Sequence, residues 1–268
     1  LKQDNTIVAA AEFLDHPSTP TGVGPGFPFA RQYVKQGLNR GRKVLLVPSA
    51  VVATHLVSTT PPTWNSTVGG SLLDAAITRA NTAIAAEPGS KIVAVLWIQG
   101  GADASDGVTQ VQYANAVDAL ITKVRANITG ATGVPFILSS EPPEVDGVVP
   151  NMVNIRAALV DTPNRNTKSY YVAPPSNMVV AGNLHFSNAG YRLVGQRQPS
   201  NRGAVLKDQR VDRGDHLRRG GTGHATVGNS AGDTGTDQAH GTDHGGRDPV
   251  PGRAADPHHP GQPGGATG

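Results

Sequence analysis

Apolar segments and helical periodicities alternate along the first part of the chain. Four short segments are apolar on both of their alternating faces, which is typical of strands buried on both sides. These segments span residues 42–50, 91–99, 134–140 and 169–174. Between and after them, apolar residues recur at the three- and four-residue spacing of helices. The helical segments span residues 71–87, 108–128, 152–160 and 187–197.

This alternation predicts an α/β fold class, with a three-layer α/β/α sandwich around a parallel sheet. Strands that are joined by helical crossovers run parallel, and helices cover both faces of their sheet. Ser71 and Ser187 stand just before two of the helical segments, where serine is a good N-cap residue. In such a sheet we expect a functional site at the carboxyl ends of the strands.

The composition changes abruptly near Gln196. Residues 196–268 contain no Phe, Trp, Tyr, Ile or Met, and they are rich in Gly, Pro, His and Arg. Such a segment cannot bury enough apolar surface to offset the entropy of an ordered backbone. We therefore predict an α/β domain over residues 1–197 and a disordered tail over residues 198–268. The composition of the tail also resembles that of a gene read out of frame.

Charge and cysteine content narrow the possible partners and cofactors. Lys and Arg together number 23 and Asp and Glu 20, so the net charge of +3 is too small to indicate nucleic acid or an anionic membrane surface. The absence of cysteine excludes disulfides, thiolate metal sites and a cysteine nucleophile. No apolar run approaches the roughly 18 residues of a membrane span. We expect neither a nucleic-acid nor a membrane partner.

Three loops at the expected carboxyl edge of the sheet carry the polar side chains that could do chemistry. They supply an amide, a carboxylate, two histidines and three hydroxyls: Gln99, Asp103, His55, His185, Ser49, Thr54 and Ser187. We interpret His55 as a solvent-facing loop residue and Ser187 as a helix cap. Ser49 stays open as a nucleophile.

Four stretches of the chain resemble motifs of one enzyme family, in the same order and spacing. They are "GVGPGFPFARQY", "VLLVPSAVVAT", "VLWIQGGADA" and "LHFSNAGYRLVGQR", which together cover roughly residues 5–197. The chain resembles the sialate O-acetylesterase-like carbohydrate esterases of the Ser-Gly-Asn-His (GDSL-type, SGNH) hydrolase superfamily. The resemblance implies a flavodoxin-like order of the sheet. It implies hydrolysis of an acetyl ester on a small sugar or a polysaccharide, without a metal or organic cofactor, in an extracellular or periplasmic location.

The resemblance also implies roles for individual residues. A serine attacks the acetyl carbonyl and a histidine takes its proton, and His185 matches that base. Gln99 matches the side chain that stabilises the oxyanion, and Gly100 keeps the tight turn after the strand. Trp64 is expected either to stack on a sugar or to pack within a lid. Asp103 is expected either to contact substrate or to accept hydrogen bonds from nearby backbone N–H groups.

The chain departs from the family pattern at several positions. The nucleophile motif, G-Q-S-N, does not occur in residues 1–26, so we expect the first strand of the sheet to be missing. Gly182 stands three residues before His185, where the family has the aspartate that orients the histidine. Gly101 replaces a glutamate, and Val52 and Ala53 replace a pair of glycines.

These departures lead us to expect that the chain as given is inactive, and they leave two alternatives to an esterase. One is a non-catalytic carbohydrate-binding module that keeps Trp64, Gln99 and His185 on the same scaffold. The other is a gene fragment without a selected function.

Overall fold

The computed structural model describes residues 1–17, 23–36, 38, 41–180 and 185–197. All of the described residues belong to one compact unit. The disordered tail predicted for residues 198–268 therefore lies outside the described residues, and so does Gly182.

A parallel sheet of three strands forms the centre of the described residues. The strands are β1 (Val95–Ile98), β2 (Phe136–Ser139) and β3 (Ser169–Tyr171), in the spatial order β1-β2-β3. Leu138 of β2 lies opposite Trp97 of β1 and Tyr171 of β3. Helix α4 (Gln110–Asn127) connects β1 to β2, and helix α5 (Met152–Arg165) connects β2 to β3. The predicted α/β class with a parallel sheet is confirmed.

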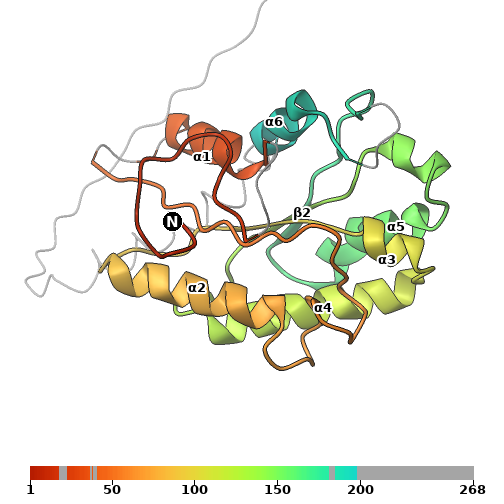
Figure 1. Cartoon of the computed structure of the whole chain (residues 1–268), viewed down its shortest axis with the longest axis horizontal. Coiled ribbons are helices and arrows are strands. Elements are labelled where there is room, and N and C mark those ends of the chain that lie inside the picture. Colours follow the sequence, from red (N-terminus) through yellow and green to blue (C-terminus); the bar gives the residue numbers. More distant parts are fainter. Residues whose placement is uncertain (18–22, 37, 39–40, 181–184, 198–268) are drawn as a thin grey trace, which may run out of the picture. The chain divides into compact units, whose positions relative to one another are not determined.

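Helices cover the two faces of this sheet in separate layers (Figure 1). Helices α1 (Gly26–Lys35) and α6 (Asn188–Arg197) pack together on one side of β2, and α2 (Leu72–Ala86) and α4 lie on the other side. The strand residues alternate accordingly: Ile137 joins the core with α1, while Phe136 and Leu138 join the core with α2, α4 and α5. This two-sided core explains why the strand segments are apolar at almost every position.

Side-chain caps fix the starts of the helices that the periodicity predicted. The hydroxyl of Ser71 accepts the N–H of Asp74 at the start of α2, and the hydroxyl of Ser187 accepts the N–H of Gly190 at the start of α6. Both N-caps are confirmed. Thr109 forms a capping box with Gln112 at the start of α4. Helix α6 lies so close to α1 that a Cβ at Gly195 would stand 2.3 Å from the carbonyl oxygen of Pro25.

Two parts of the prediction are wrong. Residues 42–50 form no strand, although Val44 packs against the core of α1. Apolar character shows that a segment is buried, but a strand also needs a hydrogen-bonded neighbour, and none of the described strands pairs with this segment. Three short helical segments were also not predicted: α1, α3 (Gly101–Ser105) and the 3₁₀ helix η1 (Pro143–Gly147).

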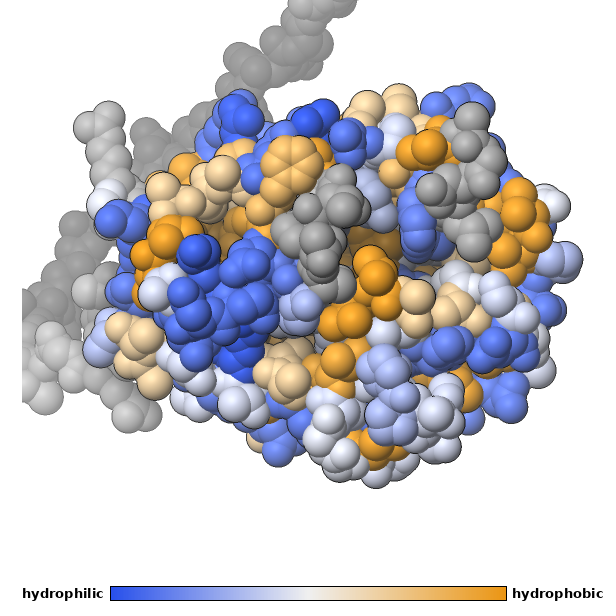
Figure 2. Space-filling model, in the orientation of Figure 1, coloured by the Kyte–Doolittle hydropathy of each residue, from blue (hydrophilic) through white to orange (hydrophobic). Residues whose placement is uncertain are grey.

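The surface of the described residues mixes hydrophilic and hydrophobic side chains. On the face shown in Figure 2, the two kinds are interspersed over most of the surface. Within the described ranges, no helix is both long enough and apolar enough to cross a membrane.

Candidate active site

Two groups of polar residues stand at the carboxyl ends of neighbouring strands, one after β1 and one after β2. The group after β1 begins with a turn that only glycine accommodates. Gly100 has a φ of +147°, and a Cβ at this position would stand 2.3 Å from Cγ2 of Ile155 in α5. The turn lets α3 start directly after the strand, and Asp103 of α3 then points toward the loop at residues 54–57.

Asp103 is fully buried, and protein groups bind its carboxylate. It accepts the backbone N–H of Leu56 at 2.9 Å and that of Val57 at 2.9 Å. It also accepts an amide hydrogen of Gln99, with Nε2 at 2.6 Å from Oδ2. Of the two roles that the sequence left open, the structure places Asp103 as an acceptor for backbone N–H groups. With an exposed fraction of 0%, its carboxylate presents no surface to a substrate.

Gln99 uses both ends of its side-chain amide within the protein. Nε2 donates to the carbonyl oxygen of Thr54 at 3.0 Å and to Asp103, while Oε1 accepts the phenol hydrogen of Tyr113 at 2.7 Å. An oxyanion donor needs a free N–H that points at the developing charge. In this structure Gln99 instead fastens the loop at Thr54 to the end of β1.

Trp64 lies in the core beside the same loop. Its exposed fraction is 6%, and its ring meets that of Trp97 edge-on, with the centroids 5.4 Å apart. The indole N–H donates to the hydroxyl of Thr54 at 2.9 Å. The ring packs against Trp97 and the N–H donates to Thr54. Of the two roles expected for Trp64, these contacts correspond to packing. We call Thr54, Trp64, Gln99, Asp103 and Tyr113 the β1 clamp.

Tyr113 is the member of the β1 clamp that sequence reasoning missed. It stands on the apolar face of α4 and is fully buried, with its hydroxyl on the side chain and the carbonyl oxygen of Gln99. Burial and the nearby charge of Asp103 raise the pKa of the phenol. In the sequence, this role was indicated only by one tyrosine hydroxyl on an otherwise apolar helical face.

The group after β2 consists of a buried carboxylate and an exposed imidazole. Glu141 follows β2 by two residues, and 9% of its side chain is exposed. His185 stands just before α6, and 59% of its side chain is exposed. Nδ1 of His185 lies 4.0 Å from Oε1 of Glu141. We call Glu141 and His185 the β2 pair. Sequence reasoning found His185 and missed Glu141, whose signal was a carboxylate directly after a buried strand.

The carboxylate of Glu141 is poorly compensated. Its Oε2 is buried and has no hydrogen-bond partner among the described residues. Burial raises the pKa of Glu141 to about 7, and the charge of Arg156 opposes this rise only in part. Arg156 directs its two terminal nitrogens elsewhere, to the hydroxyl of Ser140, the carbonyl oxygens of Glu141 and Pro142 and the carboxylate of Asp146.

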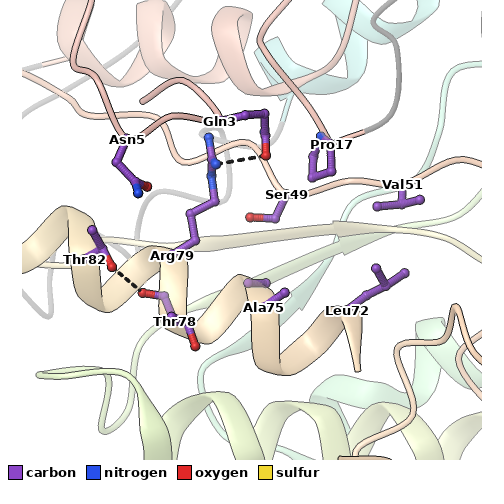
Figure 3. A pocket seen from close by; sticks show the side chains of 11 residues that line it. Gln3, Asn5, Pro17, Ser49, Val51, Leu72, Ala75, Thr78, Arg79 and Thr82 are labelled. Atoms are coloured by element: carbon purple, nitrogen blue, oxygen red, sulfur yellow. Dashed lines mark hydrogen bonds between the residues drawn. The ribbon is translucent and has the colours of Figure 1, made fainter. Parts of the chain in front are cut away.

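The remaining candidates Ser187, His55 and Ser49 have contacts or surroundings other than the β2 pair. Ser187 caps α6, and His55 pairs with Asp106 at 3.1 Å. Ser49 lies in the wall of a cavity of about 420 Å³ beside α2, together with Arg79 (Figure 3). The described residues that line this cavity include no histidine and no carboxylate, so they offer Ser49 no base.

Two of the other departures from the family pattern, Val52 and Gly101, have little effect on the local packing. The side chain of Val52 is 70% exposed, and a Cβ at Gly101 would meet no atom within 4 Å. Among the described residues, no group of three or more His, Asp or Glu side chains is arranged to hold a metal ion.

Comparisons with known proteins identify a family and support the fold. A family model described as a carbohydrate esterase, sialic acid-specific acetylesterase, matches residues 1–201. Among solved structures, the chain is similar to a protein from Arabidopsis thaliana, with 23% identity and a TM-score of 0.64 over 78% of this chain and 80% of that one. It is also similar to NanS, with 16% identity and a TM-score of 0.53 over 70% and 72% of the two chains. At these identities the two structures show the fold alone. A search of curated proteins finds no match.

Proposed function

The chain belongs to the carbohydrate esterase family of sialic acid-specific acetylesterases, and on that premise we propose that it takes part in the removal of O-acetyl groups from carbohydrate, with His185 as the general base. The observation that carries the proposal is the β2 pair. An exposed imidazole beside a buried carboxylate is the arrangement in which a histidine can accept a proton from an attacking hydroxyl.

The proposed chemistry is acyl transfer in two steps. A serine oxygen attacks the acetyl carbonyl, and Nε2 of His185 takes the serine proton and passes it to the departing sugar hydroxyl. Water then attacks the acyl-enzyme with His185 again as the base, which releases acetate. In the described part of the chain, no hydrogen bond joins a serine hydroxyl to His185. The proposal therefore takes the serine from the family's G-Q-S-N motif.

A carbohydrate-binding module is the second function that the sequence left open. It would need exposed aromatic and amide groups, because sugars are bound by stacking and by free hydrogen-bond donors. The buried ring of Trp64 and the occupied amide of Gln99 offer neither. The esterase proposal has the stronger support for this reason.

The test compares three proteins on an aryl acetate and on O-acetylated sialic acid. They are the full chain, the full chain with a strand bearing G-Q-S-N fused ahead of Leu1, and the fused protein with His185→Ala. We expect no hydrolysis by the first and hydrolysis by the second. The third should lose on the order of 10⁴-fold or more in kcat, because the base is gone. The proposal is wrong if the full chain and its own His185→Ala variant hydrolyse acetyl esters equally fast.

A further inference from the structure

A buried carboxylate oxygen without a hydrogen-bond partner needs an explanation. Removing a carboxylate from water is costly unless hydrogen bonds or an opposite charge compensate it. Oε2 of Glu141 has no hydrogen-bond partner among the described residues. The adjacent positively charged group does not supply one either, because Nε of Arg156 is itself buried and without a partner in the same part of the chain. Unsatisfied groups of this kind gather at functional sites.

We propose that Glu141 is the positioning residue for His185: its carboxylate accepts the Nδ1 hydrogen of the imidazole and so takes the place of the aspartate that the chain lacks at Gly182. This inference rests on the proposed function, since it gives His185 the part of the base. A hydrogen on Nδ1 leaves the lone pair of Nε2 free to accept a proton from the attacking hydroxyl.

The geometry needs only a small change to make this bond. Nδ1 and Oε1 are 4.0 Å apart, and a hydrogen bond requires roughly 3 Å. His185 is the partner that can move, because 59% of its side chain is exposed and its ring can turn about two bonds. Such bonds are often long in the absence of substrate and shorten in the complex.

The backbone around Glu141 is fixed more firmly than its side chain. Arg156 donates to the hydroxyl of Ser140 at 2.6 Å and to the carbonyl oxygen of Glu141 at 3.0 Å. The hydroxyls of Ser140 and Tyr171 are 3.0 Å apart, which connects the same loop to β3. A loop held in this way keeps the carboxylate at the end of β2, within reach of the residue before α6.

Several titratable groups face Glu141 from the elements packed around it. Arg156 belongs to α5 and forms an ion pair with Asp146 of η1. Tyr113 of α4 and Tyr191 of α6 both have a raised pKa, mainly through burial and in part through the charge of Glu141. His185 is the exposed member of this set, and its imidazole lies 4.0 Å from the carboxylate of Glu141.

The test measures the tautomer of His185 in the full chain by ¹⁵N NMR of labelled histidines, at about pH 9, where imidazoles are neutral. The signal is assigned by its loss in His185→Ala. We expect the hydrogen on Nδ1 in the wild-type protein. In Glu141→Ala we expect it to move to Nε2, the form that a free imidazole prefers. Glu141→Gln, which keeps the volume of the side chain, should give a smaller shift in the same direction.

Asp106→Asn is the matched control, because Asp106 is the carboxylate beside His55, at 3.1 Å. It should change the signal of His55 and leave that of His185 as it is. The inference is overturned if the tautomer of His185 is the same in the wild-type protein and in Glu141→Ala, with circular dichroism showing that the variant is folded. The tautomer measurement does not depend on hydrolysis. A negative result would overturn the role of Glu141, whereas the esterase proposal is tested separately by the hydrolysis assay.

Discussion

Asp103 and Glu141 are both buried carboxylates at the carboxyl edge of one sheet, yet their surroundings are opposite. Two backbone N–H groups and an amide hydrogen bind Asp103. Glu141 has an oxygen without a partner and an exposed imidazole 4.0 Å away. A compensated carboxylate holds a loop in place at little cost, whereas burying an uncompensated one is costly, and such groups are more frequent at functional sites. The comparison assigns a structural role to the carboxylate after β1 and supports the proposed chemistry at the carboxylate after β2.

The local sequence accounts for much of this difference. After β1, Gly100 allows an abrupt turn, and Asp103 then reaches a loop that presents backbone N–H groups. After β2, Glu141 is followed by Pro142 and Pro143, and proline has no N–H to donate. The same residue type at the same edge of the sheet therefore finds donors in one place and lacks them in the other.

Asp103→Ala should have the largest effect on stability. It would leave two backbone N–H groups and the amide of Gln99 without their acceptor, at about 1–3 kcal/mol for each buried donor. We expect the free energy of unfolding to fall by about 4 kcal/mol in urea titrations. The matched control is Asp106→Ala, an exposed carboxylate three residues later, which should cost no more than about 0.5 kcal/mol. Equal losses in the two variants would contradict the structural role of Asp103.

Glu141→Gln should stabilise the protein at alkaline pH. The folded state holds the pKa of Glu141 at about 7 against the ordinary 4.5 of glutamate, so the folded protein binds more protons between these pH values. Stability is therefore lost as the pH rises from about 4.5 through about 7, by about 3 kcal/mol for a shift of this size.

Urea titrations at about pH 5 and pH 8 check this prediction. Glutamine carries no charge at either pH, so the variant should gain most at the higher pH and lose that part of the pH dependence. A variant that is less stable than the wild-type protein at the higher pH would contradict the claim that burial destabilises the charged form of Glu141.

Tyr113→Phe should have the smallest effect of the three. It removes the hydroxyl that bonds Oε1 of Gln99 but keeps the ring in the core. We expect a loss of about 1 kcal/mol in the free energy of unfolding. The ¹⁵N signal of His185 should not change, because the β1 clamp and the β2 pair are expected to act separately. A changed tautomer of His185 in this variant would show that the two groups are coupled.

Local patterns predicted most of the fold. Elements that depend on neighbouring residues can be predicted from the spacing of residues in the sequence. These are the strands at β1, β2 and β3, the periodic helices and the caps at Ser71 and Ser187. Residues 42–50 failed as a strand because pairing depends on a distant partner. The apolar pattern indicated burial there, and burial is what the structure shows for Pro48 and in part for Val44.

The candidate site was harder to predict than the fold. His185 could be found because a whole motif surrounds it. The roles of Trp64, Asp103 and Gln99 depend on which groups meet them in space, and the sequence gives no sign that Thr54 and Tyr113 take up their hydrogen bonds. Glu141 was missed because a single glutamate after a strand is common, and only its burial without a partner sets it apart.

The most direct test of the difference between the two carboxylates is a ¹³C NMR titration of the glutamate carboxyls. The chain has only four glutamates, Glu12, Glu87, Glu141 and Glu144, so the signals can be assigned by single substitutions, with Glu141→Gln first. We expect Glu141 to titrate with a pKa of about 7, and the ion pair with Arg192 to hold the pKa of Glu12 below its usual range. A Glu141 signal that titrates in the ordinary range of glutamate would contradict the claim that the burial of its carboxylate is compensated only in part.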